Sequence, residues 1–313
     1  MHISDNREEK NLIIGVPYSV AWAILQSWID VQALRNLNLV CCCSIADREH
    51  FFDLFDFPDF VLQSRVVLSN KSDLKWLIQK CMRMHSICTT YATDSVLMEK
   101  YLFNFGDSVC AVQFDPQTNR EIVGALIAYC HGLTYLTLCD AKMRSVDLRR
   151  LLTGCRHSLT DLHISALPRD EPLFASIRDS SRQNLPAFRL EKLQKVQVLH
   201  NVDPVQLAGL AHAGLNVNSL CLRGIANNIS AKVVFAFENL VRLDLQKTDI
   251  SDEFMGNLAY STFNLQSLNI QQCNNLTGES LHHIHTGPSF LSLHTLYVED
   301  YVGFTANNLT SIL

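Results

Sequence analysis

The chain lacks the sequence features that mark most nucleotide-binding enzymes, hydrolases and membrane proteins. No Gly-x-x-x-x-Gly-Lys-Ser/Thr or Gly-x-Gly-x-x-Gly segment occurs, so the usual phosphate-cradling loops are absent. No Gly-x-Ser-x-Gly nucleophile motif occurs either. No run of about 18 apolar residues is available to span a bilayer, and the polar, charged first ten residues do not form a signal-peptide core. We therefore expect no catalytic residue, no cofactor and no membrane contact.

The charge balance is also unremarkable. Charged residues make up 18% of the 313 residues, below the usual quarter, and the formal net charge is −5. This balance favours neither nucleic acid nor an anionic membrane as a partner. The 11 cysteines are odd in number and scattered over the whole length. Because no signal peptide is evident, we expect free thiols and a reducing compartment, the cytoplasm or the nucleus.

Two clusters contain side chains of the kinds that ligate metals. The run 41–43 consists of three cysteines, but no second Cys-x-x-Cys pair at zinc spacing accompanies it. Among His282, His283 and His285, only His282 and His285 share a helix face. We expect buried structural thiols in the first cluster, surface or packing histidines in the second, and no metal site.

A repeat runs through the chain instead. The pattern L-x-x-L-x-L, with other large apolar residues allowed at the L positions, occurs eight times at spacings of 24, 26, 34, 24, 23, 25 and 28 residues. Such a period is typical of leucine-rich repeats, in which each unit contributes one short strand and one helix. The copies span residues 109–114, 133–138, 159–164, 193–198, 217–222, 240–245, 265–270 and 293–298.

Two weaker units near Val66 and Met84 bring the total to about ten. A single unit leaves an apolar face bare, so the stack predicts an α/β solenoid, a horseshoe with parallel strands on the concave face and helices outside. We expect a disordered tail over residues 1–11, a helical segment over 12–58 and the solenoid over 59–313. The irregular insertion at about 166–190 is either a functional loop or a tolerated solvent loop.

The residues that alternate with the apolar letters should face the concave surface. They are polar and mixed in sign, and in the C-terminal half they include the Arg, Asp, Gln, Asn and Tyr side chains that suit protein recognition. The alternative is a merely solvated face. The candidate binding residues are Arg223, Arg242, Asp244, Gln246, Asn269, Gln271, Tyr297 and Glu299.

The segment over residues 16–43 differs from the repeats. Val16-Pro17 opens a helix with proline near its first position, and Asp30 can cap a second helix. Apolar residues recur at helical spacing in both, at Val20, Ile24, Leu25, Leu34, Leu37 and Val40. Two short helices with this much apolar surface must pack on the horseshoe, on a partner, or on both.

This segment resembles an F-box. The resemblance lies in the Leu-Pro-type opening at Val16-Pro17, the Ile24-Leu25 pair, the break at Asp30 and the L-x-x-L-x-L-V-C run over residues 34–41. The repeats behind it resemble the cysteine-containing leucine-rich repeats of F-box proteins, most closely over residues 265–281 with Cys273. An F-box followed by leucine-rich repeats is the order of the F-box/leucine-rich-repeat family.

The resemblance implies a non-catalytic substrate-recognition subunit of an SCF-type E3 ubiquitin ligase. The F-box would dock on a Skp-family adaptor, which joins a cullin scaffold, and the repeats would bind a protein substrate through the candidate residues above. The adaptor-facing and core positions of the box would be Pro17, Ile24, Leu25, Trp28, Leu34, Leu37 and Val40.

The alternative is a leucine-rich-repeat interaction scaffold, unrelated to ubiquitin, whose first helices only cap the horseshoe. An adaptor-binding segment should leave part of the Pro17, Ile24, Leu25 and Trp28 region exposed, whereas a cap should bury all of it. The chain stops at Leu313 without an obvious polar closing repeat. We expect either a fragment of a longer protein or an adhesive last strand near Leu296 and Val298.

Overall fold

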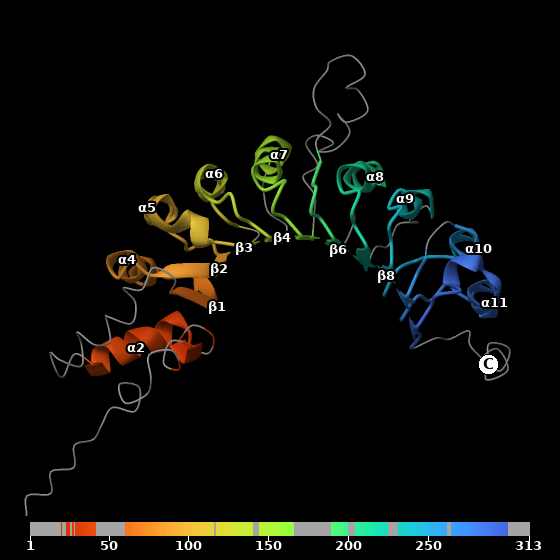
Figure 1. Ribbon diagram of the computed structural model, residues 1–313, viewed down its shortest axis with the longest axis horizontal. Helices are drawn as coiled ribbons and strands as arrows, with labels where there is room; N and C mark the ends of the chain where they lie inside the picture. The colour runs from red at the N-terminus through yellow and green to blue at the C-terminus, as the bar shows by residue number, and fades with distance from the viewer. Residues whose placement is uncertain are drawn as a thin grey trace, which may run out of the picture.

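The computed structural model describes residues 20, 23–25, 27, 29–41, 60–115, 117–139, 144–165, 189–199, 204–224, 231–261 and 264–299. Within them, ten strands form one parallel sheet in chain order. The strands line the inner side of a curved arc, and the helices between them form its outer side (Figure 1). The predicted α/β leucine-rich-repeat solenoid is confirmed.

The strands are short, as one-strand repeats require. They are β1 (Val61–Leu68), β2 (Arg83–Thr89), β3 (Ala111–Phe114), β4 (Tyr135–Leu138), β5 (Asp161–Ile164), β6 (Lys195–Leu199), β7 (Ser219–Arg223), β8 (Arg242–Asp244), β9 (Ser267–Asn269) and β10 (Thr295–Tyr297). The α-helices are α2 (Val31–Cys41), α4 (Lys71–Gln79), α5 (Ser95–Phe105), α6 (Arg120–Tyr129), α7 (Ser145–Gly154), α8 (Pro204–Ala213), α9 (Ala231–Phe235), α10 (Asp252–Ala259) and α11 (Gly278–Thr286). Two 3-10 turns are η1 (Gly106–Ser108) and η4 (Pro288–Phe290).

Burial of the repeated apolar residues explains why every strand takes the same register. From residue 109 to residue 270, each L position of the pattern is at most 2% exposed. Equivalent residues pair from strand to strand, for example Leu136 with Leu162 and Leu243 with Leu268. A slip by one residue would turn each apolar set out of the core, so burial enforces the alignment. In the last described repeat, Leu293, Leu296 and Val298 are only partly buried.

Helix starts follow the expected capping chemistry. The side chains of Asn70, Asp94, Asn119, Ser251 and Thr277 each accept a hydrogen bond from a backbone N–H of the first turn of the helix they precede. Such caps stabilise a helix by about 1 kcal/mol. At α10, for example, Ser251 Oγ accepts from Phe254 N at 3.3 Å.

The repeat cysteines fill the turns between helices and strands. Cys130 and Cys155 are 2% and 1% exposed. Cys273 is also buried, and its Sγ donates to the carbonyl of Leu245 at 3.0 Å. Thr248, one repeat earlier, reaches the same carbonyl at 2.6 Å. Cys273 therefore ties its turn to that of the preceding repeat, whereas Cys155 Sγ donates to the Leu151 carbonyl of its own helix at 3.1 Å.

Several predictions concern residues outside the described part of the chain. They are the tail over 1–11, most of the insertion over 166–190, the cysteines at 42 and 43, and the end of the chain beyond residue 299. None of the helices that the structure describes combines the length and the hydrophobicity needed to cross a bilayer.

Candidate functional site

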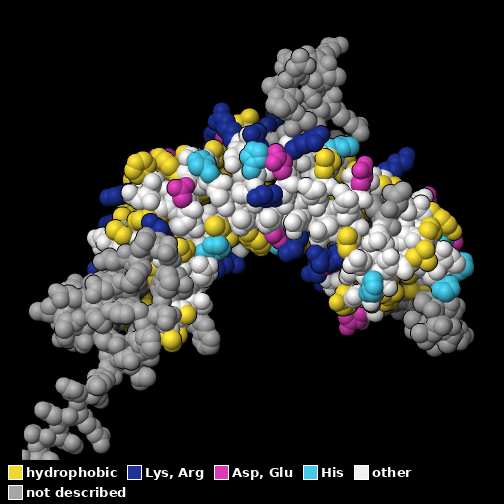
Figure 2. All heavy atoms as spheres, viewed as in Figure 1, with side chains coloured by type: hydrophobic (Ala, Val, Ile, Leu, Met, Phe, Trp, Pro, Cys, Tyr) yellow, Lys and Arg dark blue, Asp and Glu magenta, His cyan; other side chains and the backbone are white. Residues whose placement is uncertain are grey.

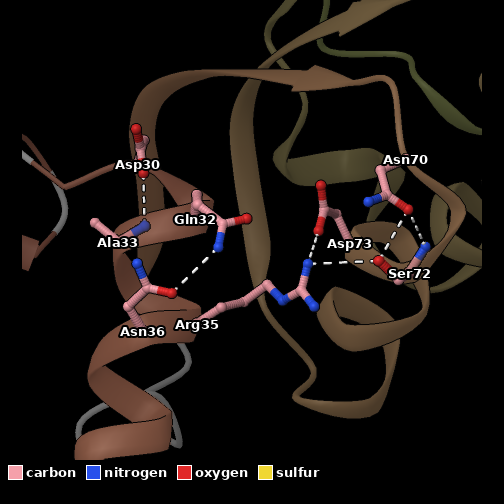
Figure 3. A network of polar contacts seen from close by, with 8 residues as sticks. All are labelled: Asp30, Gln32, Ala33, Arg35, Asn36, Asn70, Ser72 and Asp73. Atoms are coloured by element: carbon pink, nitrogen blue, oxygen red, sulfur yellow. Dashed lines mark hydrogen bonds and ion pairs between the residues drawn. The ribbon is translucent and has the colours of Figure 1, made fainter.

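Polar contacts attach helix α2 and the residue just before its cap to the first repeat. Asp30 caps it, with its Oδ1 accepting from Ala33 N at 2.7 Å. Arg35 forms an ion pair with Asp73 in the first turn of α4 and lies 3.4 Å from the hydroxyl of Ser72 (Figure 3). The hydroxyl of Ser64 in β1 donates to the carbonyl of Ile29 at 3.2 Å. The predicted cap at Asp30 is confirmed.

The apolar residues of this segment divide into two sets. Leu25 and Leu34 are 0% exposed and Val31 is 6% exposed, and all three belong to the continuous core that runs through the solenoid. Val20 and Ile24, in contrast, are 46% and 42% exposed. Both have helical backbone, and a spacing of four residues is one at which helical side chains share a face. One side of the segment is thus buried in the core while another leaves large apolar side chains in solvent.

The other adaptor-facing candidates are placed as follows. Leu37 is half-buried and packs against the core. Val40 lies in α2 by its backbone, and Pro17 and Trp28 lie outside the described residues. The structure therefore brings Leu25, Leu34 and Leu37 to the core side, with Ile24 alone among the described candidates on an exposed face.

The concave surface is built from rows of residues that the sheet register aligns. One row runs Ala111, Tyr135, Asp161, Lys195, Ser219, Arg242, Ser267 and Thr295. The next runs Gln113, Thr137, His163, Gln197, Cys221, Asp244, Asn269 and Tyr297. Because residues in a row pair directly between neighbouring strands, they form a continuous polar strip on the inner side of the arc.

The centre of this strip contains an aromatic and imidazole pair. The Tyr135 hydroxyl and His163 Nδ1 are 3.0 Å apart in a hydrogen bond, and their rings meet edge to face at a centroid distance of 4.8 Å. Burial lowers the pKa of His163, an effect opposed by nearby Asp161. Lys195 forms an ion pair with Asp161 at 3.1 Å. Burial therefore favours the neutral imidazole, and Tyr135 and His163 form a joined pair on the concave surface.

A neighbouring hydroxyl lacks a hydrogen bond. Thr137 Oγ1, in the same row as His163, is buried and has no partner within the described part of the chain. An unsatisfied buried polar group costs about 1–3 kcal/mol. The sequence alone places Tyr135, Thr137 and His163 on the concave face, but it contains no signal that these residues would contact one another.

The predicted binding residues at the C-terminal end gather on adjacent strands, although several satisfy one another. Arg223 donates to Asp244 Oδ2 through Nε at 2.9 Å and Nη2 at 2.6 Å, and this carboxylate raises the pKa of the guanidinium. Gln271 Nε2 donates to Glu299 at 2.5 Å. Residues engaged in this way offer fewer free groups to a partner than their identity suggests.

The remaining predicted residues are less engaged in contacts with one another. Arg242 is exposed and has no ion-pair partner within the described ranges, and Tyr297 is 50% exposed. Gln246 and Asn269 are half-buried, and Asn269 Oδ1 accepts from Gln271 N at 3.1 Å. Lys and Arg side chains gather near β8 on the inner side of the arc (Figure 2). Exposed arginine and tyrosine are the usual anchors of protein interfaces.

The cysteines near this surface are poor nucleophiles. Burial, together with a smaller effect of the Asp244 carboxylate, raises the pKa of Cys221 to about 12. Burial likewise raises the pKa of Cys110. A thiol with so high a pKa stays protonated at neutral pH, and only the thiolate attacks or ligates. Within the described ranges, no three His, Cys, Asp or Glu side chains come together in a metal-ligating group.

Comparison with known proteins adds only limited information. No protein-family model matches the chain, and no curated protein matches it. Solved structures that are similar include an internalin (InlF) from Listeria monocytogenes, with 16% identity and a TM-score of 0.44 over 86% of this chain and 81% of that one. The leucine-rich-repeat-containing protein LegL7 from Legionella pneumophila has 17% identity and a TM-score of 0.48 over 80% and 87%.

A third similar structure is that of the Rad7 and Elc1 complex in yeast, with 14% identity and a TM-score of 0.49 over 84% of this chain and 76% of that one. Likenesses this weak say nothing of what the chain binds. The fold assignment rests instead on the eightfold sequence pattern, the ten-stranded parallel sheet and the buried L positions. On those grounds the protein is a leucine-rich-repeat solenoid.

Proposed function

We propose that this chain is the substrate-recognition subunit of an SCF-type ubiquitin ligase. The F-box-like segment would dock on a Skp-family adaptor, and the concave face would bind a protein substrate. The observation that carries the proposal is the exposure of Val20 and Ile24 on a segment whose other side, at Leu25 and Leu34, is buried in the core. A helix used only as a cap gains nothing from large apolar residues on its solvent side.

The anchoring of α2 supports the same role. The Arg35–Asp73 ion pair (Figure 3) and the Ser64–Ile29 hydrogen bond join the N-terminal segment to the first repeat. Such a joint would hold the docking face at a fixed orientation to the concave surface. A ligase adaptor works by geometry, because it must bring a substrate lysine close to a charged ubiquitin carrier. The chemistry itself would reside in partner enzymes.

On the concave face, we expect two contact regions for the substrate. The centre offers the Tyr135–His163 pair. The C-terminal end offers the exposed Arg242 and Tyr297. Because the remaining predicted residues there are partly engaged with one another, Arg242 and Tyr297 should contribute most of the affinity at that end.

Co-purification with a Skp-family adaptor tests the proposal. Ile24→Asp should abolish adaptor capture, because it places a charge on the exposed apolar face without touching the core. Val96→Asp is the matched control, since Val96 is 72% exposed on α5, in another part of the solenoid. Leu25→Ala is unsuitable, because Leu25 is fully buried and its loss would lower the stability of the fold. Equal capture by the two aspartate variants, or no capture by the wild type, would defeat the proposal.

The second candidate function is a leucine-rich-repeat scaffold unrelated to ubiquitin, in which the first helices only cap the horseshoe. The burial of Leu25, Val31 and Leu34 favours a capping contribution. That reading predicts no adaptor binding and no effect of Ile24→Asp on any interaction of the concave face.

We place the protein in the cytoplasm or nucleus, where free thiols such as the buried Cys130 and Cys155 stay reduced.

A further inference from the structure

The C-terminal half of the concave strip exposes its cations more than its carboxylates. Lys195 Nζ lies 3.1 Å from Asp161 Oδ1, and the two side chains are 52% and 20% exposed. Arg223 Nη2 lies 2.6 Å from Asp244 Oδ2, and these side chains are 46% and 20% exposed. In both ion pairs the carboxylate is the more covered partner. A protein that approaches the strip here therefore meets mainly positive charge.

Arg242 adds a third cation and has no counter-ion within the described ranges. It is exposed, and the sheet register places it between Ser219 in β7 and Ser267 in β9. Both neighbours are uncharged, so the row supplies no carboxylate to the guanidinium from either side. Asp244, two residues farther along β8, already accepts two hydrogen bonds from Arg223. The charge of Arg242 is thus left to solvent or to a ligand.

The charged residues of these strands leave a surplus of one positive charge. Strands β5 to β8 contain three Lys or Arg side chains and two carboxylates, in a chain whose formal net charge is −5. Strands β9 and β10 contain no charged residue, and Glu299, just after β10, accepts a hydrogen bond from Gln271. Figure 2 shows Lys and Arg side chains gathered near β8 on the inner side of the arc. The local excess is therefore opposite in sign to the net charge of the protein.

We propose that this cationic surface, defined as Lys195, Arg223 and Arg242, binds an acidic segment of the substrate, with a glutamate or aspartate carboxylate paired to Arg242. The inference rests on the substrate-binding role proposed above for the concave face. A guanidinium binds a carboxylate through two parallel N–H bonds. Because Lys195 and Arg223 are already paired, the unmatched charge equals that of a single carboxylate.

The same charge balance disfavours other common anions. A phosphoserine carries close to two negative charges at neutral pH, and a nucleic-acid strand carries one at every phosphate. Either ligand would need several cations without counter-ions, whereas the described residues of β5 to β8 offer only Arg242. A carboxylate matches this surface better than a phosphate does.

The sheet geometry also predicts a spacing of acidic residues in the segment. Lys195 and Arg242 lie in one row of the sheet, with β7 between their strands. Two strand spacings amount to about 10 Å, and an extended chain covers this distance in about three residues. A second carboxylate three residues from the first would therefore reach Lys195. The ammonium of Lys195 is half exposed and has three N–H donors, so it can bind this carboxylate as well as Asp161.

Fluorescence anisotropy with the full chain at low ionic strength tests the surface. The probes are labelled peptides of one sequence that carry two glutamates three residues apart, two glutamines in their place, or a single phosphoserine, whose charge nearly equals that of the two glutamates. The glutamate peptide should bind most tightly and the glutamine peptide should not bind. Added salt should weaken binding, because exposed charges are screened.

Variants of Arg242 connect binding to the proposed residue. Arg242→Gln should raise the Kd for the glutamate peptide about tenfold, and Arg242→Glu should raise it further. Arg150→Gln is the matched control, because it removes the same charge from an exposed position on α7, in the helical layer, and should leave the Kd unchanged. If Arg242→Gln does not fold, Arg242→Lys keeps the charge but loses the planar fork and should still weaken binding.

Four outcomes would overturn the assignment. They are no binding of the glutamate peptide to the wild type, equal binding of the glutamine peptide, an unchanged Kd for the Arg242 variants, and tighter binding of the phosphoserine peptide or of a labelled oligothymidylate through Arg242. The last result would assign the surface to phosphate groups. None of these results would alter adaptor capture through Ile24, so failure here is distinguishable from failure of the proposed adaptor role.

Discussion

Replacing Leu34 with alanine should loosen one end of the solenoid and leave the other end unchanged. Leu34 is 0% exposed in α2 and belongs to the same core as Leu62 in β1. Truncating a buried leucine to alanine costs about 2–5 kcal/mol. In a repeat protein each unit contacts only its neighbours, so this loss should be felt mainly by the adjacent repeats.

The magnitude can be read out by native-state hydrogen exchange. At about 1.4 kcal/mol for each factor of ten, a loss of about 3 kcal/mol corresponds to exchange roughly 100-fold faster. We expect that acceleration in the amides of β1 and β2 and little change in β8 and β9. Leu268→Ala is the matched control, because Leu268 is also 0% exposed but lies in β9. It should give the reverse pattern.

Two results would refute this reasoning. Equal acceleration in β1 and β9 after either substitution would show that the solenoid unfolds as one unit rather than repeat by repeat. Unchanged exchange in β1 after Leu34→Ala would show that α2 contributes nothing to the stability of the first repeat, and the joint assumed between docking segment and arc would be lost.

Three further predictions concern thiols, glycines and one imidazole. At pH 8, iodoacetamide should label the exposed Cys81 rapidly but Cys155 only on unfolding, because burial raises the pKa of Cys155 to about 12. Mass spectrometry of the labelled peptides measures the difference. The stability that the protonated Cys155 thiol contributes should fall as the pH rises from about 9 toward 12. Gly124→Ala should stabilise the protein by about 0.5–1 kcal/mol, because an added Cβ at this position on α6 meets nothing within 4 Å. Gly106→Ala should destabilise the protein, because its Cβ would lie 2.5 Å from a backbone oxygen. Urea denaturation compares the two variants. Burial lowers the pKa of His163, so stability should decline as the pH falls below the ordinary value of 6.5, and NMR titration of the ring should show a midpoint below that value.

The fold was predictable because the apolar residues that form the sequence pattern are the residues whose burial drives folding. Each L position from residue 109 to residue 270 is buried, so the spacing of the apolar residues gives both the strands and their register. The cap at Ser251 was also predictable, since a hydroxyl before a helical run supplies a local acceptor. These features depend on residues close in sequence or on a strict repeat.

Contacts on the surface were less predictable. Alternation places Tyr135 and His163 on the concave face, but only the pairing of β4 with β5 shows that they bond. The ion pair between Arg120 and Asp147 depends on how α6 stacks beside α7, which the strand pattern does not encode. Such contacts follow from the register between repeats.

The N-terminal segment shows the same limit. Ile24 and Leu25 are adjacent and equally apolar, yet one is 42% exposed and the other is fully buried. Helical periodicity identifies the two as apolar positions but does not show which side of the helix the solenoid covers. The structure supplies that distinction, and with it the choice of Ile24 rather than Leu25 as the residue to test.

Site-specific photo-crosslinking at residue 24 tests the central claim most directly. The full chain would carry a benzophenone amino acid in place of Ile24 and be irradiated with a purified Skp-family adaptor, and mass spectrometry would identify the attached peptide. The account predicts covalent attachment to the adaptor, because Ile24 is 42% exposed on the face proposed for docking. Attachment only to the chain's own repeats, with the adaptor present in excess, would show that the segment is a cap and contradict the account.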